Sequence, residues 1–224
     1  MRRLLLPALL PALLLHAFQP IPQSAHRWPR SGRSKHASTT TAAPETTLLE
    51  DGRKVNVFPD DESIAAHIVS EVGRIAEQAI KERGCFAMSI GSGTTVQPLS
   101  SLAVKSWASQ GGMDFSRWHV FFGNERTTGD SAYKCFEGAQ TFVKACNIPS
   151  ANVHQVPGGD GDPEAAALAY EDLLRASCPD VLATCPDSDM PSLDLVLLGS
   201  GADGHTASLY PGACAWVMCS GCAN

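Results

Sequence analysis

The stretch GSGADGHTASLYPG, residues 199–212, contains one histidine, His205, among four glycines. It follows the apolar run LDLVLL, and Asp203 stands two positions before the histidine. Neutral imidazole can accept a proton from water near physiological pH, and a nearby carboxylate could raise its basicity and hold its tautomer. His205 is therefore a candidate general base with Asp203 as its partner. A histidine that only supports the local structure is the alternative that this stretch leaves open.

The same stretch also satisfies GxGxxG, the pattern of dinucleotide-binding turns, through Gly199, Gly201 and Gly204. That motif opens a long helix and is followed about 20 residues later by an acidic side chain. Here a Pro-Gly pair arrives within eight residues of Gly204, and no Asp or Glu follows Asp203. We therefore expect neither a dinucleotide site nor another cofactor here.

A second polar turn, SIGSGTT, follows another apolar run and contains Gly91, Ser92, Gly93, Thr94 and Thr95. Glycines allow backbone N–H groups to approach phosphate oxygens, and the three hydroxyls are further donors. The turn is a candidate phosphate-binding loop. A plain connection between a strand and a helix is its alternative.

A third polar turn, GNER, follows the apolar run WHVFF and contains Asn124 and Arg126. The planar guanidinium of an arginine at a strand end can clamp a phosphate, whereas a surface ion pair is the competing interpretation. We interpret His119 and His154, which lie inside apolar runs, as packed histidines.

The elements that must position these turns alternate between strand and helix from about residue 55 onward. Asp61 or Ser63 could cap the first helix, and Gly84 ends it. Continuous apolar strands between helices predict an α/β fold, a Rossmann-like parallel sheet with helices on both faces. We expect strands at 85–90, 118–122, 153–156 and 193–198, helices over about 64–83, 98–108, 131–146 and 163–177, and a loop at 185–192.

In such sheets ligands bind at the carboxyl ends of the strands. The turns after residues 90, 122 and 198 all stand at predicted strand ends. We therefore expect them to meet in one composite site.

Charge is distributed unevenly along the 224 residues, whose formal net charge is −6. Residues 1–44 hold six basic and no acidic side chains, so the rest holds 11 basic and 23 acidic ones, a formal charge of −12. The strong negative charge of residues 45–224 argues against nucleic acid as a partner. The one CxxC pair, CSGC near the end, has no second pair to complete a zinc site, so no metal is expected.

The N-terminal region is typical of targeting sequences. Residues 1–17 resemble a signal peptide, and residues 18–50 are rich in Arg, Ser and Thr like a transit peptide. Together they predict import into a plastid through a bipartite presequence, with secretion or a cytoplasmic location as alternatives. The apolar part is short and broken by prolines, so we expect no membrane association in the mature form.

Four motifs resemble one family, in order, from about residue 55 to 212. DLVLLGSGADGHTASLYPG resembles the signature of 6-phosphogluconolactonases. The family's phosphate loop is similar to SIGSGTTVQPLSSL, and its strand with a Glu-Arg turn is similar to WHVFFGNERTTGDSAY. The strand, loop and helix that follow in the family are similar to VHQVPGGDGDPEAAALAYEDLL. Glucosamine-6-phosphate deaminases share the architecture, but their histidine block continues differently. The continuation TASLYP at residues 206–211 is that of the lactonases.

The resemblance implies hydrolysis of 6-phosphoglucono-δ-lactone to 6-phosphogluconate in the oxidative pentose phosphate pathway, without metal or cofactor. His205 would act as general base on water, with Asn124 and Asp203 beside it. Arg126 and residues 91–95 would hold the substrate phosphate. Glucose-6-phosphate dehydrogenase would be the pathway neighbour.

Two departures from the family define the alternatives. Asn124 replaces the usual Asp, and the resemblance stops at Gly212, before the Cys-rich tail 213–224. We expect an incomplete domain over residues 51–212 that lacks its C-terminal part. A non-catalytic sugar-phosphate-binding relative and a deaminase-like isomerase are the alternative functions.

Overall fold

The computed structural model describes residues 44–93, 96–100, 113–130, 132–158, 161–185 and 190–212. Residues 1–43 of the presequence-like region, Thr94, Thr95, most of the helix expected at 98–108, and the tail 213–224 lie outside the described residues. The chain divides into two compact units, 1–40 and 41–224, and the described residues all belong to the second. None of the described helices is long and apolar enough to span a membrane.

Helix α1, Asp61–Arg83, confirms the first predicted helix but begins with a different cap. The carboxylate of Asp60, in an extended conformation, accepts a hydrogen bond of 2.8 Å from the Ser63 N–H. The expected caps Asp61 and Ser63 were wrong, because both already lie within the helix and the side chain of the preceding residue, Asp60, accepts one of its first N–H groups. Gly84, at φ 84°, ends the helix as predicted.

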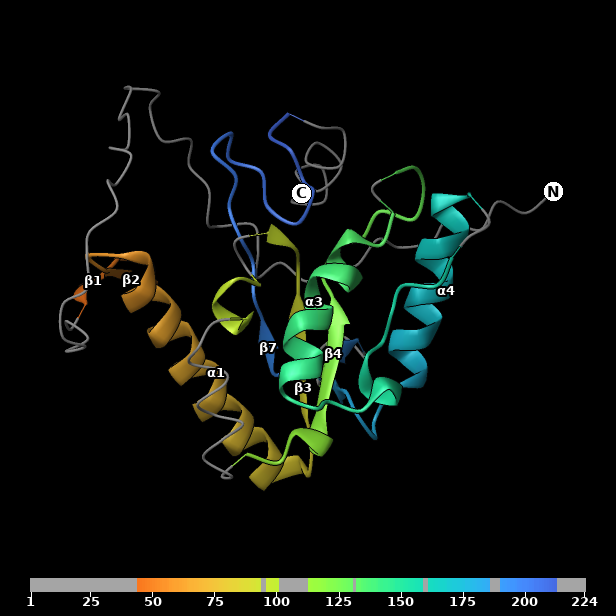
Figure 1. Ribbon diagram of the computed structural model, residues 1–224, viewed down its shortest axis with the longest axis horizontal. Coiled ribbons are helices and arrows are strands. Elements are labelled where there is room, and N and C mark those ends of the chain that lie inside the picture. The colour runs from red at the N-terminus through yellow and green to blue at the C-terminus, as the bar shows by residue number, and fades with distance from the viewer. Residues whose placement is uncertain are drawn as a thin grey trace. The chain divides into compact units, whose positions relative to one another are not determined.

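A three-stranded parallel sheet forms the centre of the fold, in the order β4 (Trp118–Phe122), β3 (Phe86–Ile90), β7 (Leu195–Val196). Phe86 lies opposite Trp118, and Met88 lies opposite Leu195. Figure 1 shows β3 and β4 side by side behind helix α3, Lys134–Ala145.

Two predicted strands are shorter than their apolar runs. The run 193–198 contributes only two ladder residues, although the N–H groups of Asp194 and Leu197 still donate to β3 carbonyls. The run 153–156 makes a single bridge, between Val153 and Val120. An apolar run predicts that its residues are buried, but a strand also requires a neighbouring strand aligned with it along its length.

Helices cover both faces of the sheet, as predicted. Alternate strand residues, including Phe86 and Trp118, pack with α1 and α3 in the main core. The opposite face, with Ala87 and Phe121, packs against Leu182 and against Leu173 and Leu174 of α4, Pro163–Ala176. This alternation is the pleat of a strand buried on both sides.

The remaining elements are short. Strands β1 (Glu45–Leu48) and β2 (Lys54–Val57) form one antiparallel pair, and β5 (Ala183–Thr184) and β6 (Pro191–Ser192) form another. The second pair corrects the expected loop at 185–192, whose last two residues are β6. Single 3₁₀ turns lie at η3 (Pro98–Ser100), η4 (Phe115–Arg117) and η5 (Ser150–Asn152).

One partly buried ion pair joins the starts of β3 and β7 to the end of α1. The Asp194 carboxylate, just before β7, accepts the Ala87 N–H at 2.8 Å and pairs with the guanidinium of Arg83 at the end of α1. The start of β7 is thereby joined to both β3 and α1. The turn after β7 is consequently aimed at the same end of the sheet as the turns after β3 and β4.

Candidate active site

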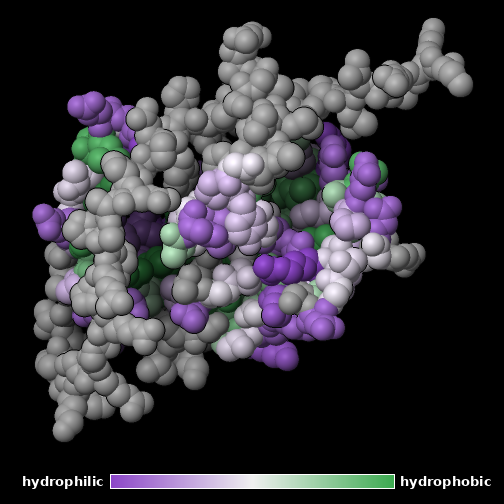
Figure 2. Space-filling view, turned by 90° about the horizontal axis from the view of Figure 1, so that it is seen from above, coloured by the Kyte–Doolittle hydropathy of each residue, from purple (hydrophilic) through white to green (hydrophobic). Residues whose placement is uncertain are grey.

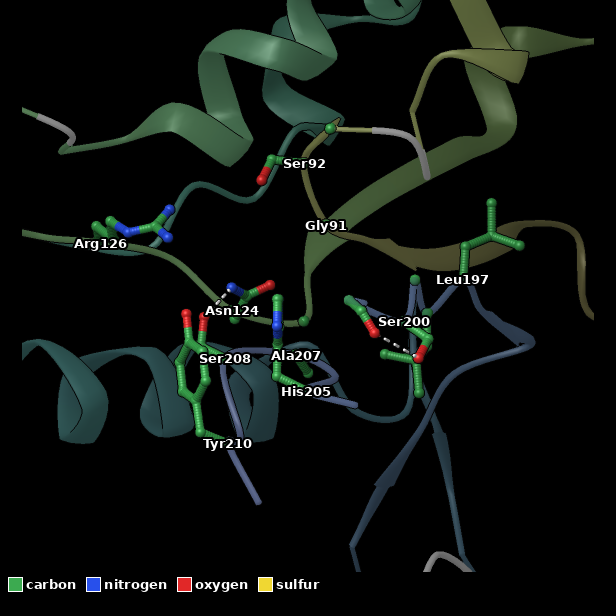
Figure 3. A pocket seen from close by; sticks show the side chains of 15 residues that line it. Gly91, Ser92, Asn124, Arg126, Leu197, Ser200, His205, Ala207, Ser208 and Tyr210 are labelled. Atoms are coloured by element: carbon green, nitrogen blue, oxygen red, sulfur yellow. Dashed lines mark hydrogen bonds between the residues drawn. The ribbon is translucent and has the colours of Figure 1, made fainter. Parts of the chain in front are cut away.

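The turns after β3, β4 and β7 line one cavity of about 400 Å³ at the carboxyl ends of the strands (Figure 3). Gly91, Ser92 and Gly93 come from the first turn, and Asn124 and Arg126 come from the second. The third turn contributes the lining residues between 197 and 210, His205 among them. Figure 2 views the molecule from above, and the surface in its centre is mostly hydrophilic or intermediate, with apolar patches to either side.

His205 is paired with Asp203. Its Nδ1 lies 2.5 Å from Asp203 Oδ1, and the same carboxylate oxygen accepts the His205 backbone N–H at 3.3 Å. The hydrogen bond from the imidazole lowers the pKa of Asp203 below its ordinary value. With a proton on Nδ1, the other ring nitrogen, Nε2, presents a lone pair, which is the form a general base requires.

The imidazole is confined by a glycine and a tyrosine. A Cβ added to Gly201 would lie only 2.2 Å from His205 Cε1 and Nδ1, so the ring lies directly against the glycine backbone. The ring also stacks on Tyr210, with centroids 4.7 Å apart. The Gly201 N–H donates to the His205 carbonyl at 2.8 Å and closes the turn. The glycine that mimics a nucleotide motif in the sequence therefore makes room for the histidine.

A tight hairpin follows the histidine. Thr206 and Leu209 exchange backbone hydrogen bonds, and the two residues between them, Ala207 and Ser208, have φ values of 48° and 63°. Two consecutive left-handed residues define a type I′ turn, which usually contains Asn and Gly. The Thr206 hydroxyl anchors this hairpin to the Gly199 carbonyl at 2.9 Å.

Asn124 connects the second turn to the third. Its Nδ2 donates to Ser208 Oγ at 2.6 Å, drawn as a dashed line in Figure 3. Its Oδ1 faces Gly91, where an added Cβ would lie 3.5 Å from it. This side chain therefore touches both neighbouring turns and contacts the hairpin through a neutral donor.

Arg126 and Ser92 lie in the part of the cavity away from His205 in Figure 3. The Arg126 side chain is exposed and makes no ion pair with any described residue, so the surface ion-pair interpretation has no support there. The Ser92 hydroxyl interacts with the thiol of Cys135 below it, whose pKa is raised by burial.

Glu125 has a structural role that sequence reasoning missed. Its carboxylate accepts the backbone N–H groups of Arg126 at 2.9 Å, Cys135 at 3.1 Å and Phe136 at 2.8 Å. The last two belong to the first turn of α3, where N–H groups lack partners within the helix, and its own cap residue, Tyr133, supplies no side-chain hydrogen bond. Glu125 therefore caps α3 from the neighbouring turn and holds Asn124 and Arg126 in place.

Tyr170 of α4 is a second missed residue. Its hydroxyl accepts the Phe122 N–H at 2.8 Å and donates to the Phe122 carbonyl at 3.2 Å, at the last residue of β4. Burial raises the pKa of Tyr170 to about 12, so the phenol stays protonated. In sequence an aromatic residue on a helix looks like ordinary core, and no local signal indicates this contact.

His119 and His154 lie outside the cavity and confirm the interpretation as packed histidines. Their rings meet at 3.1 Å between Nδ1 and Nε2, and His154 stacks on Phe121 with centroids 4.2 Å apart. Burial lowers the pKa of both, that of His154 to about 4. Within the described parts of the chain, no group of three metal-ligating side chains occurs.

The family model described as glucosamine-6-phosphate isomerases/6-phosphogluconolactonase matches residues 59–220. The chain is 34% identical over 176 residues to Probable 6-phosphogluconolactonase 4 of Arabidopsis thaliana, covering 75% of this chain and 66% of that protein. It is 30% identical over 192 residues to 6-phosphogluconolactonase 3, chloroplastic, of the same plant, covering 81% of this chain and 58% of that protein.

The chain therefore spans less than two thirds of the length of these curated relatives. Among solved structures, the 6-phosphogluconolactonase from Trypanosoma cruzi matches with a TM-score of 0.53 at 20% identity, over 70% of this chain and 61% of that chain. That likeness shows a common fold.

Proposed function

The chain belongs to the glucosamine-6-phosphate isomerase/6-phosphogluconolactonase family, and we propose that it hydrolyses 6-phosphoglucono-δ-lactone to 6-phosphogluconate. The observation that carries this proposal is His205, which is paired with Asp203 and lines one cavity together with Asn124 and Arg126. The relatives named above are called 6-phosphogluconolactonases, and the continuation TASLYP supports the same branch of the family.

His205 is proposed to act as the general base. Its Nε2 takes a proton from water as the water oxygen bonds to the lactone carbonyl carbon, and the carbonyl oxygen becomes an oxyanion. The tetrahedral intermediate collapses by breaking the bond between that carbon and the ring oxygen. The proton returns from the imidazole to the ring oxygen, which becomes a hydroxyl group. Asp203 holds the imidazole in the required tautomer and stabilises it while it is charged.

The phosphate is proposed to bind at the opposite part of the cavity. Arg126 has an exposed guanidinium there, and residues 91–93 add glycine backbone and a hydroxyl. Thr94 and Thr95 continue this loop outside the described residues. Remote binding of the phosphate would orient the lactone against His205, which contributes to rate by fixing the reacting geometry. Glucose-6-phosphate dehydrogenase makes such a lactone and would be the supplier of substrate.

The assay must exceed the spontaneous hydrolysis of the lactone. Purified full-length chain is mixed with lactone freshly generated from glucose 6-phosphate, and acid release is compared with a protein-free control. We expect acceleration by the wild type and loss of that acceleration in His205→Ala. His67→Ala, which changes a histidine of α1 outside the cavity lining, should retain it.

Three results would redirect the assignment. Acceleration that survives in His205→Ala removes the histidine from its role as base. Binding of 6-phosphogluconate without any acceleration identifies the non-catalytic sugar-phosphate-binding relative. Ammonia release from glucosamine 6-phosphate, in place of lactone hydrolysis, identifies the deaminase-like isomerase.

We also propose that the protein acts in a plastid. The support is the composition of residues 1–50 and the relative named as chloroplastic. Residues 1–50 fused to a fluorescent protein should direct it into plastids. Secreted or cytoplasmic fluorescence contradicts this location.

A further inference from the structure

The hairpin after His205 holds its two central residues in an unfavourable backbone conformation. Ala207 and Ser208 are consecutive non-glycine residues with positive φ, and both line the cavity. Positive φ is unfavourable for residues other than glycine, and strain of this kind persists where the surrounding structure enforces it, often at functional sites. The strained conformation therefore indicates that the position of the Ser208 side chain has a function.

The hydrogen bond to Asn124 determines which way the Ser208 hydroxyl can donate. A hydroxyl has one proton to donate and two lone pairs that accept. The amide nitrogen of Asn124 can only donate, at 2.6 Å, so it occupies a lone pair of Ser208 Oγ. No other described group accepts the Ser208 proton. An aspartate at position 124 would instead accept that proton and leave Ser208 with only lone pairs toward the cavity.

We infer that Asn124 makes Ser208 a hydrogen-bond donor to the carbonyl oxygen of the lactone. This inference rests on the proposed function. Ser208 stands three residues after His205 on the wall of the same cavity, whereas Arg126 and Ser92 lie beyond Asn124 in Figure 3. The ester end of a substrate whose phosphate meets Arg126 therefore lies against the hairpin.

The donor acts on the oxygen whose charge changes during the reaction. Water addition at the carbonyl carbon moves an electron pair onto the carbonyl oxygen, and a donor already aimed at that oxygen stabilises the transition state more than the substrate. The bond from Asn124 polarises the Ser208 hydroxyl and strengthens its donation. The strained turn keeps the hydroxyl between these two partners.

The first test removes the hydroxyl without unfolding the turn. Ser208→Gly suits the positive φ, and Ser208→Ala keeps the Cβ, which the same turn already accommodates at Ala207. We expect both variants to lower kcat about 10- to 100-fold, which is less than the about 100- to 1,000-fold cost of losing a donor in a water-excluded oxyanion hole, because Ser208 is exposed. The matched control is Asn147→Gly, which relieves positive φ on an exposed loop outside the cavity and should leave kcat unchanged. Wild-type kcat in both Ser208 variants overturns the inference.

The second test asks whether Asn124 acts through Ser208. In an Asn124→Asp background the Ser208 proton points to the carboxylate, so Ser208→Gly should then change kcat by less than about 2-fold. This holds whatever Asn124→Asp itself does to the rate. An equal loss from Ser208→Gly in both backgrounds means that Asn124 does not direct the donor and overturns the inference.

The third test separates this inference from the proposed function. The product 6-phosphogluconate carries a carboxylate oxygen where the carbonyl oxygen was, so calorimetric titration reads the same contact without turnover. If the wild type binds the product but does not accelerate hydrolysis, the proposed function fails. The donor role then stands if Ser208→Gly weakens binding about 5-fold or more while Asn147→Gly does not. A wild type that fails to bind the product, or equal affinity in all three proteins, overturns the donor role.

Discussion

The molecule holds two histidine pairs of opposite character. His205 is partnered by the carboxylate of Asp203, lines the cavity, and has no hydrogen-bond partner for its Nε2 among the described residues. His119 and His154 are partnered by each other, half-buried beside Phe121. Burial without a carboxylate lowers the pKa of the second pair, which favours neutral rings. A histidine is a candidate base when the fold places a carboxylate beside one ring nitrogen and leaves the other without a partner. A histidine surrounded by aromatic side chains is a packing residue.

Among variants that keep His205, the largest expected effect comes from displacing its imidazole while keeping the fold. Gly201→Ala places a methyl group within 2.2 Å of the imidazole, so the ring must move. Since a displacement of about 1 Å can cost about 100-fold in rate, we expect kcat/KM to fall by about 100-fold. Gly138→Ala, on an exposed site of α3 with nothing within 4 Å, is the control and should retain activity with slightly higher Tm. Near-normal turnover of Gly201→Ala would show that the ring position is not critical.

Removing the carboxylate makes the first pair more like the second. Asp203→Asn removes the negative charge beside the imidazole and replaces the carboxylate oxygen that holds Nδ1–H with a neutral amide, a weaker acceptor. We expect kcat to fall about 10- to 100-fold, less than for a buried carboxylate because Asp203 is exposed. Steady-state kinetics at several pH values measure this. An unchanged kcat would show that the function of His205 does not depend on the carboxylate of Asp203.

The second pair should appear in the pH dependence of stability. The folded-state pKa of His154, about 4, lies below its ordinary value of 6.5, so the unfolded chain binds more protons between these pH values. The stabilisation is fully present above pH 6.5 and is lost as the pH falls toward 4, by about 1–2 kcal/mol after allowing for partial exposure. Urea unfolding from pH 7 to 5 measures this slope, and His154→Gln should flatten it. The same slope in the variant would assign the loss to other groups.

The smallest expected effect concerns β4, which holds His119 and leads into Asn124. Tyr170→Phe removes the hydroxyl that accepts and donates hydrogen bonds at Phe122. We expect a loss of about 1 kcal/mol of stability, and a measurable rise in KM because the turn that carries Arg126 is less firmly held. Thermal unfolding and kinetics test the two parts separately. A stability loss with unchanged KM would confine Tyr170 to the fold.

Much of the fold follows from local pattern. The repeat of apolar residues and the terminal Gly84 predict α1, and the apolar runs before residues 91 and 123 predict β3 and β4. Local sequence patterns predict strand length less well, because the length of a strand depends on how far it pairs with its neighbour. The runs at 153–156 and 193–198 look alike as strands, yet one makes a single bridge and the other two ladder residues.

Residue types and spacing by themselves determined that three polar turns end three strands, because periodicity and turn chemistry act within a few residues. They also determined that His205 has a carboxylate two positions away. Only the tertiary structure decided that Asn124 donates to Ser208, 84 positions further on, and that Tyr170 secures Phe122. It also decided that Glu125 caps α3 instead of pairing with a cation. Such contacts depend on how distant elements pack, and their partners leave no periodic trace along the chain.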